Sequence, residues 1–149
     1  MLKFKIKADQ IKRFSDFLLS LELRGTQNRM RVRMIKQLDE KLNKIQSEYT
    51  EHVLKEHCHL DSEGNPKIKE VNGQQLWDVK KENREDFNKD YLELWNEEHV
   101  IEGEDNKNML LSVKESVLNC DKLFSGQEAL QYDHWCDLVE AIEDQKEKE

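Results

Sequence analysis

The apolar residues between positions 28 and 57 recur at the spacing of an α-helix. The repeating residues are Ile35, Leu38, Leu42, Ile45, Tyr49 and Val53. Steps of three and four residues place side chains in one stripe along a helix. The pattern predicts a helix of about 30 residues, about 45 Å long at 1.5 Å per residue, with Asn28 as its N-cap. Because no other segment supports so long an element, we expect the rest of the chain to pack along it.

Two shorter patterns precede this helix. Residues 2–7 alternate strictly between apolar side chains and lysines, which is the period of a half-buried strand. From residue 8 the period becomes helical, and Gly25 suits the left-handed conformation that ends many helices. The apolar face of this helix comprises Ile11, Phe14, Phe17, Leu18 and Leu21. We therefore expect a strand and then a helix that lies antiparallel to the long one.

Residues 60–79 interrupt the helical pattern. Two short runs with strand character, 67–71 and 75–79, flank Asn72-Gly73, a dipeptide favoured in tight hairpin turns. An isolated hairpin has marginal stability. The segment therefore predicts a small protruding β-hairpin, with Trp77 anchoring it to the helices.

The remainder of the chain is again mostly helical. The extended stretch 99–103 could pair with residues 2–6, and the charged residues 144–149 are expected to fray as an acidic tail. Three further helices are predicted, over about 82–98, 106–119 and 125–142. The predicted fold is thus mainly α: a five-helix single domain, 1–149, around one long central helix, with a small β-hairpin and a short N-terminal strand.

Charge is distributed unevenly along the chain. The net charge is −8, yet residues 1–59 carry 13 Lys and Arg against 8 Asp and Glu, and residues 60–149 carry 11 against 24. The first part is therefore basic and the second strongly acidic. Either the two parts attract each other in the folded protein, or each offers a charged surface to an oppositely charged partner.

The cysteines and the lack of a long apolar run indicate the cellular compartment of the protein. Cys58, Cys120 and Cys136 are odd in number and widely separated, so they suggest no disulfide framework. No signal-peptide core and no 18-residue apolar run is present. We expect a cytoplasmic protein with reduced thiols and no membrane partner.

One cluster could hold a metal ion. It consists of His52, His57, Cys58 and His59. Zinc sites usually combine two short-spaced ligand pairs, and the second pair is missing here. A polar helix end is therefore the favoured interpretation, and no metal or cofactor is predicted.

The chain also lacks a Gly-rich phosphate loop and a coherent acid–base–nucleophile set. We predict that the protein is not an enzyme.

The acidic third helix is either a solvated face or a recognition surface. Carboxylates along a rigid helix can imitate a phosphate backbone and so occupy a nucleic-acid groove of another protein. The candidate partner-binding residues are Glu82, Glu85, Asp86, Asp90, Glu93 and Glu97 on this helix, and Lys67, Lys69 and Trp77 on the hairpin.

A basic cluster lies at the start of the long helix. Its members are Arg24, Arg29, Arg31, Arg33 and Lys36. Steps of two residues spread arginines around a helix, so they cannot all face one phosphate run. Pairing with the acidic part of the chain is favoured, and contact with nucleic acid is the alternative.

The chain resembles a family of small proteins encoded by phages and prophages of Gram-positive bacteria, catalogued as a domain of unknown function. The resemblance follows most of the chain. It rests on Phe17-Leu18, Leu21–Gly25, Arg29 and Arg31, the turn Asp61–Pro66, Glu82-Asn83, Phe87–Leu94 and Glu97–Gly103. It implies a phage origin and an accessory role in the cytoplasm of the infected bacterial cell, and it brings no catalytic residue or cofactor.

The predicted function follows from these interpretations. We expect a non-enzymatic protein that binds and modulates or inhibits a bacterial or phage protein, as an antidefence or host-takeover factor would. The alternative is a phage structural or assembly protein, or a nucleic-acid-binding protein that uses the basic cluster.

Overall fold

The computed structural model describes residues 1–143, so the predicted frayed tail at 144–149 lies outside the described residues. Its contacts group the chain into two compact units. Unit 1 contains Met1–Glu40 and the chain from Glu98 onward, and unit 2 is Lys41–Glu97. The boundary between Glu40 and Lys41 falls within a helix.

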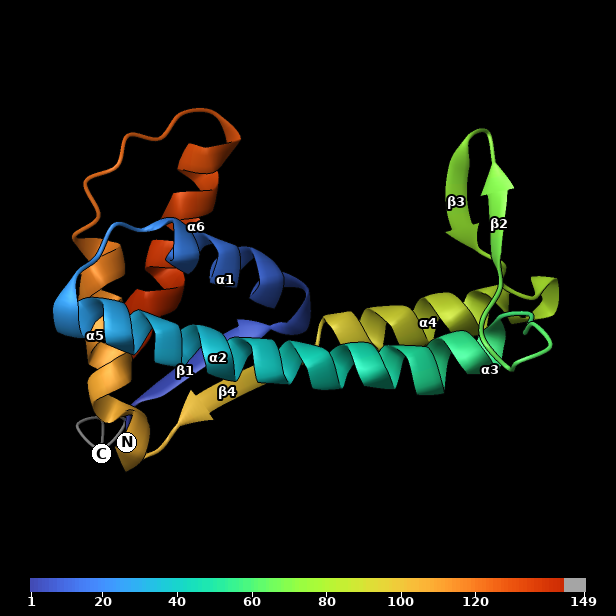
Figure 1. The fold of residues 1–149 in the computed structure, drawn as a ribbon, viewed down its shortest axis with the longest axis horizontal. Coiled ribbons are helices and arrows are strands. Elements are labelled where there is room, and N and C mark those ends of the chain that lie inside the picture. The colour runs from blue at the N-terminus through green and yellow to red at the C-terminus, as the bar shows by residue number, and fades with distance from the viewer. Residues whose placement is uncertain (144–149) are drawn as a thin grey trace. The chain divides into compact units, whose positions relative to one another are not determined.

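The predicted mainly α fold is confirmed, with its long central helix, hairpin and short strand pair (Figure 1). The helices in the described part of the chain are α1 Ile11–Ser20, α2 Gly25–Glu48, α3 Lys55–His57, α4 Arg84–Trp95, α5 Lys107–Leu118 and α6 Gln127–Glu140. The strands are β1 Lys3–Lys7, β2 Ile68–Val71, β3 Gln74–Trp77 and β4 Glu98–Glu102. None of these helices is both long and apolar enough to cross a membrane.

The long helix differs from its prediction at both ends. It begins at Gly25, which has φ +58°, so Asn28 lies inside the first turn and is not the N-cap. Towards its C-terminus, α2 continues through a π-helical segment, Tyr49–Leu54, into α3. The Lys55 N–H donates to the Thr50 carbonyl, five residues earlier. The neighbours Val53 and Leu54 in this segment are both buried.

Unit 1 is built on a strand pair and an aromatic core. β1 pairs antiparallel with β4, from Lys3 opposite Glu102 to Lys7 opposite Glu98, and Phe4 and Ile6 are buried as the alternation predicts. The Phe14 ring lies 5.3 Å from that of Phe4 and 5.2 Å from that of Trp135. These contacts join β1, α1 and α6 in one core.

The part of α2 in unit 1 buries a stripe rotated from the predicted one. Met30, Met34 and Leu38 are buried, whereas Ile35 is only half-buried. Methionine fills irregular gaps in a core as well as leucine does, so the two methionines take the inward positions.

Unit 2 combines α4, the π-helical segment and the hairpin. The ring of Tyr49 lies 5.8 Å from that of Tyr91 and 5.6 Å from that of Trp95, both edge-to-face. Such aromatic contacts hold α4 against the π-helical segment.

The hairpin has the predicted turn. Asn72 and Gly73 both have positive φ, 51° and 81°, as a type I′ turn requires. Trp77 is 37% exposed and lines a groove together with Arg84 and Phe87 of α4, so its predicted role as the anchor of the hairpin stays a prediction. Backbone hydrogen bonds attach the hairpin to the end of α3 and the residues that follow it. His59 N–H donates to Asp78 O at 2.9 Å, and Lys80 N–H donates to His57 O at 2.8 Å.

Candidate functional site

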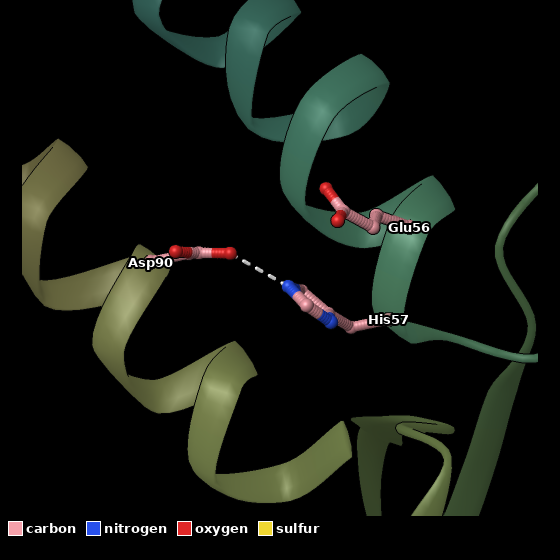
Figure 2. A group of neighbouring side chains, drawn as sticks. All are labelled: Glu56, His57 and Asp90. Carbon is pink, nitrogen blue, oxygen red and sulfur yellow. Dashed lines mark hydrogen bonds and ion pairs between the residues drawn. The ribbon is translucent and has the colours of Figure 1, made fainter.

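The centre of the candidate site is His57, the last residue of α3, whose residue surface is 3% exposed. Its Nε2 lies 2.7 Å from Asp90 Oδ2 on α4 (Figure 2). The Asn83 side-chain amide lies 3.2 Å from Nδ1. With the amide donating to Nδ1, the ring carries its proton on Nε2 and donates it to Asp90. Both ring nitrogens are therefore satisfied, and the ring orientation is fixed.

Glu56 adds a second carboxylate to this pair. One donor atom from each of Glu56, His57 and Asp90 lies within 4.8 Å of the others (Figure 2). Glu56 is exposed and Asp90 half-buried. The buried imidazole thus has two carboxylates beside it, both on the solvent side.

A hollow in unit 2 opens next to Asp90. Its volume is about 350 Å³, and it lies between the end of α2, the π-helical segment and α4. The ionisable side chains that line it are Glu48, His52, Asp90, Glu93 and Glu97. We call it the acidic hollow. Three of the six acidic residues predicted on the third helix, Asp90, Glu93 and Glu97, line this hollow. The other three, Glu82, Glu85 and Asp86, lie near the start of α4 together with Lys81 and Arg84.

The predicted histidine–cysteine cluster is divided in the structure. His57 joins Glu56 and Asp90, His52 lines the acidic hollow, and His59 is exposed. Cys58 is fully buried, and burial raises the pKa of its thiol above the ordinary value. A protonated, enclosed thiol is a poor ligand and a poor nucleophile.

Tyr49 lies in the same unit, at the start of the π-helical segment. Burial, reinforced by the neighbouring Tyr91, raises the pKa of Tyr49 to about 12. The phenol is neutral at pH 7 and acts as a packing group there.

A groove in unit 2 lies between the hairpin and the start of α4. It has a volume of about 350 Å³ and is lined by Lys69, Val71, Leu76, Trp77, Val79, Arg84, Phe87 and Asn88. Within residues 1–143 no carboxylate lines it, and neither Lys69 nor Arg84 forms an ion pair. We call it the hairpin groove. Of the predicted partner-binding residues, Lys69 and Trp77 meet there, while Lys67 is exposed at the start of the hairpin.

The basic cluster is only partly available to a ligand. Arg31 donates from Nη1 to the Leu18 carbonyl at 3.1 Å and to the Leu21 carbonyl, and from Nη2 to Asn28. It thereby adds a second donor to the Leu18 carbonyl, which also accepts from the Leu21 N–H, and supplies a donor to the Leu21 carbonyl after the end of α1. Arg24, Arg29, Arg33 and Lys36 are exposed.

Unit 1 has one further concave surface of note. It measures about 370 Å³ between α1 and α6, and its walls include Phe17, Phe124 and Tyr132. Tyr132 donates to the Val117 carbonyl at 2.7 Å and stacks on Phe124, with centroids 4.5 Å apart. Its rim carries both charge signs, from Arg13, Asp16, Lys122 and Glu128, so it selects no charge class of ligand.

Comparison of the chain with protein-family models, with curated proteins and with solved structures gave no match. The phage family suggested by the sequence therefore stays a prediction.

Proposed function

We propose that this protein is a non-enzymatic binding protein that modulates or inhibits a bacterial protein through the hairpin groove and the hairpin around it. In the phage setting implied by the sequence resemblance, this is the role of an antidefence or host-takeover factor. The observation that carries the proposal is the exposure of large apolar side chains on both faces of the hairpin.

Every residue of β2 and β3 is exposed. The exposed fractions are 56% for Ile68, 40% for Val71, 45% for Leu76 and 37% for Trp77. These side chains keep 37–56% of their surface in water, and that part contributes nothing to folding. Large exposed apolar side chains, tryptophan among them, are typical of protein-binding surfaces.

The charged side chains of the hairpin groove favour one orientation of a docked partner. Lys69 and Arg84 can pair with carboxylates of a partner, since the groove itself contributes none. Glu82, Glu85 and Asp86 lie with Lys81 and Arg84 in a separate hollow at the start of α4. The two cations of the groove favour an acidic patch on the partner, which would set the orientation of docking.

A pull-down from bacterial lysate tests this proposal. Tagged wild-type protein should retain a specific bacterial partner, and Trp77→Ser and Leu76→Ser should each weaken its capture by about tenfold or more, because loss of a central apolar contact costs about 2 kcal/mol. Both side chains are substantially exposed, so the fold should persist, as circular dichroism can verify.

Leu123→Ser is the matched control, because Leu123 is 97% exposed and lies in unit 1. It should leave capture unchanged. If the hairpin variants retain the partner as well as the wild type does, the hairpin is not the binding surface.

The alternative functions have distinct signatures. If the protein binds nucleic acid, its affinity should fall steeply with salt, and Arg29→Glu and Arg33→Glu should each weaken it. Arg31 is unsuitable for this test, since it holds the end of α1. A phage assembly protein would instead self-associate or co-purify with particles, which size-exclusion chromatography and analysis of purified virions would reveal.

A further inference from the structure

We propose that Glu56, His57 and Asp90 form a binding site for a divalent transition-metal cation, such as Zn²⁺ or Mn²⁺. The proposal is independent of the hairpin groove and of any protein partner. It rests on the donor set, on its spacing and on the hollow beside it.

The donor set is one imidazole nitrogen and two carboxylates. This combination suits Zn²⁺, Mn²⁺ and Fe²⁺, whereas Mg²⁺ and Ca²⁺ prefer oxygen ligands alone. His57 Nε2 and Asp90 Oδ2 are 2.7 Å apart, which is a hydrogen-bond distance. Two ligands on one ion with metal–ligand bonds of about 2.0–2.2 Å lie about 3.0–3.5 Å apart, so the pair would open by about 0.3–0.8 Å to admit a metal. A metal would replace the proton that these two atoms share.

Glu56 is available to complete the set. Its carboxylate forms no hydrogen bond or ion pair with the residues that the structure describes, and it can rotate because it is exposed. A small rotation would bring it from within 4.8 Å of the other two donors into coordination. Three protein ligands leave at least one position for water.

Asn83 would support the ligand from behind. The oxygen and nitrogen of an amide exchange places by a flip, and the flipped Asn83 would accept a proton from His57 Nδ1, 3.2 Å from the amide. Metal-bound histidines usually donate their second N–H to such a partner, which fixes the ring. The ring orientation needed for coordination is thus already present.

The acidic hollow provides the approach. Asp90 belongs to both the hollow and the three-residue cluster, and Glu48, Glu93 and Glu97 line the same hollow. Carboxylates in a concave surface concentrate cations at its mouth. The π-helical segment, which borders the hollow, ends two residues before Glu56; π-helical turns occur frequently at functional sites.

Calorimetric titration of the EDTA-stripped, full-length protein with MnCl₂ and with ZnCl₂ tests the site. One equivalent of each metal should bind, Zn²⁺ more tightly than Mn²⁺. Glu56→Gln and Asp90→Asn should each weaken binding by about tenfold or more, since even outer ligand partners contribute about that factor. Paramagnetic Mn²⁺ should broaden the NMR signals of Glu56, His57 and Asp90 before those of other residues.

The control is Glu85→Gln, an exposed carboxylate in the first turn of α4 and outside the cluster. It should bind metal as the wild type does. Glu56 is exposed, so its variant should fold and keep the test decisive even if Asp90→Asn were unstable. The proposal is overturned if neither metal binds, if Glu56→Gln binds as the wild type does, or if Mg²⁺ binds as tightly as Mn²⁺, which would exclude the imidazole as a ligand.

Discussion

Replacing Trp135 with alanine is expected to lower the free energy of unfolding by about 3–5 kcal/mol, the usual cost of removing a buried tryptophan. The indole is 1% exposed and lies 5.2 Å from the Phe14 ring and 6.3 Å from the Phe17 ring, centroid to centroid. Alanine would leave a cavity between α1 and α6 that neighbouring aromatic rings are too rigid to fill. Urea denaturation followed by far-UV circular dichroism measures the loss.

Leu130→Ala is the control on the same helix. Leu130 is 67% exposed, so its truncation should change the free energy of unfolding by no more than about 0.5 kcal/mol. If Trp135→Ala costs less than about 1 kcal/mol, the indole does not hold α6 to α1 and the core of unit 1 is wrongly assigned.

Replacing His57 with alanine is expected to cost about 2–3 kcal/mol, measured in the presence of EDTA. The change removes a buried ring that meets Phe87 edge-to-face at 6.2 Å, and it leaves the Asn83 amide and the Asp90 carboxylate without their partner. An unsatisfied buried polar group costs about 1–3 kcal/mol. The Asp90 side chain is 37% exposed, so water compensates part of its loss.

Two variants test whether the loss of stability comes from the His57 hydrogen bonds or from any change near the end of α3. His59→Ala alters an exposed histidine two residues away and should cost no more than about 0.5 kcal/mol. Asp90→Asn keeps a carbonyl oxygen for the His57 Nε2 proton, so it should cost less than His57→Ala. Equal losses for His57→Ala and His59→Ala would mean that the polar network does not stabilise unit 2.

The backbone at His57 also links the two proposed sites within unit 2. The His57 carbonyl accepts from Lys80 N–H, directly after the hairpin, and Cys58 pairs with Val79 in an isolated bridge. A variant that loosens His57 would therefore also disturb the hairpin, which is why the metal test uses Glu56 and the partner test uses Trp77 and Leu76.

Local patterns were sufficient for most of the secondary structure. The alternation over residues 2–7 specifies one buried face of β1, and Asn72-Gly73 specifies the type I′ turn, because each depends on neighbours in sequence alone. The pairing of β1 with β4 was also predictable from two short extended stretches, though its register required the structure. The start of the long helix was predicted three residues late, at Asn28, because a capping residue is a statistical preference and not a requirement.

The π-helical segment left no signal in the sequence. Residues 49–54 contain neither glycine nor proline, and their apolar spacing fits an ordinary α-helix. Val53 and Leu54 in this segment are both buried, and contacts between elements cannot be read from the spacing within one helix. The same reason explains why the pattern missed that Met30 and Met34, and not Ile35, take the inward positions of α2.

The candidate sites show where sequence reasoning ends. The sequence by itself determined the helical class, the hairpin and the uneven charge, and it named Lys69 and Trp77 as candidates. Only the tertiary structure brought Asp90 to His57, 33 residues earlier in the chain, and placed Arg84 and Phe87 beside the hairpin. Periodicity assigns each side chain to a face of its own element, but which faces meet is decided by burial of apolar surface across the whole chain.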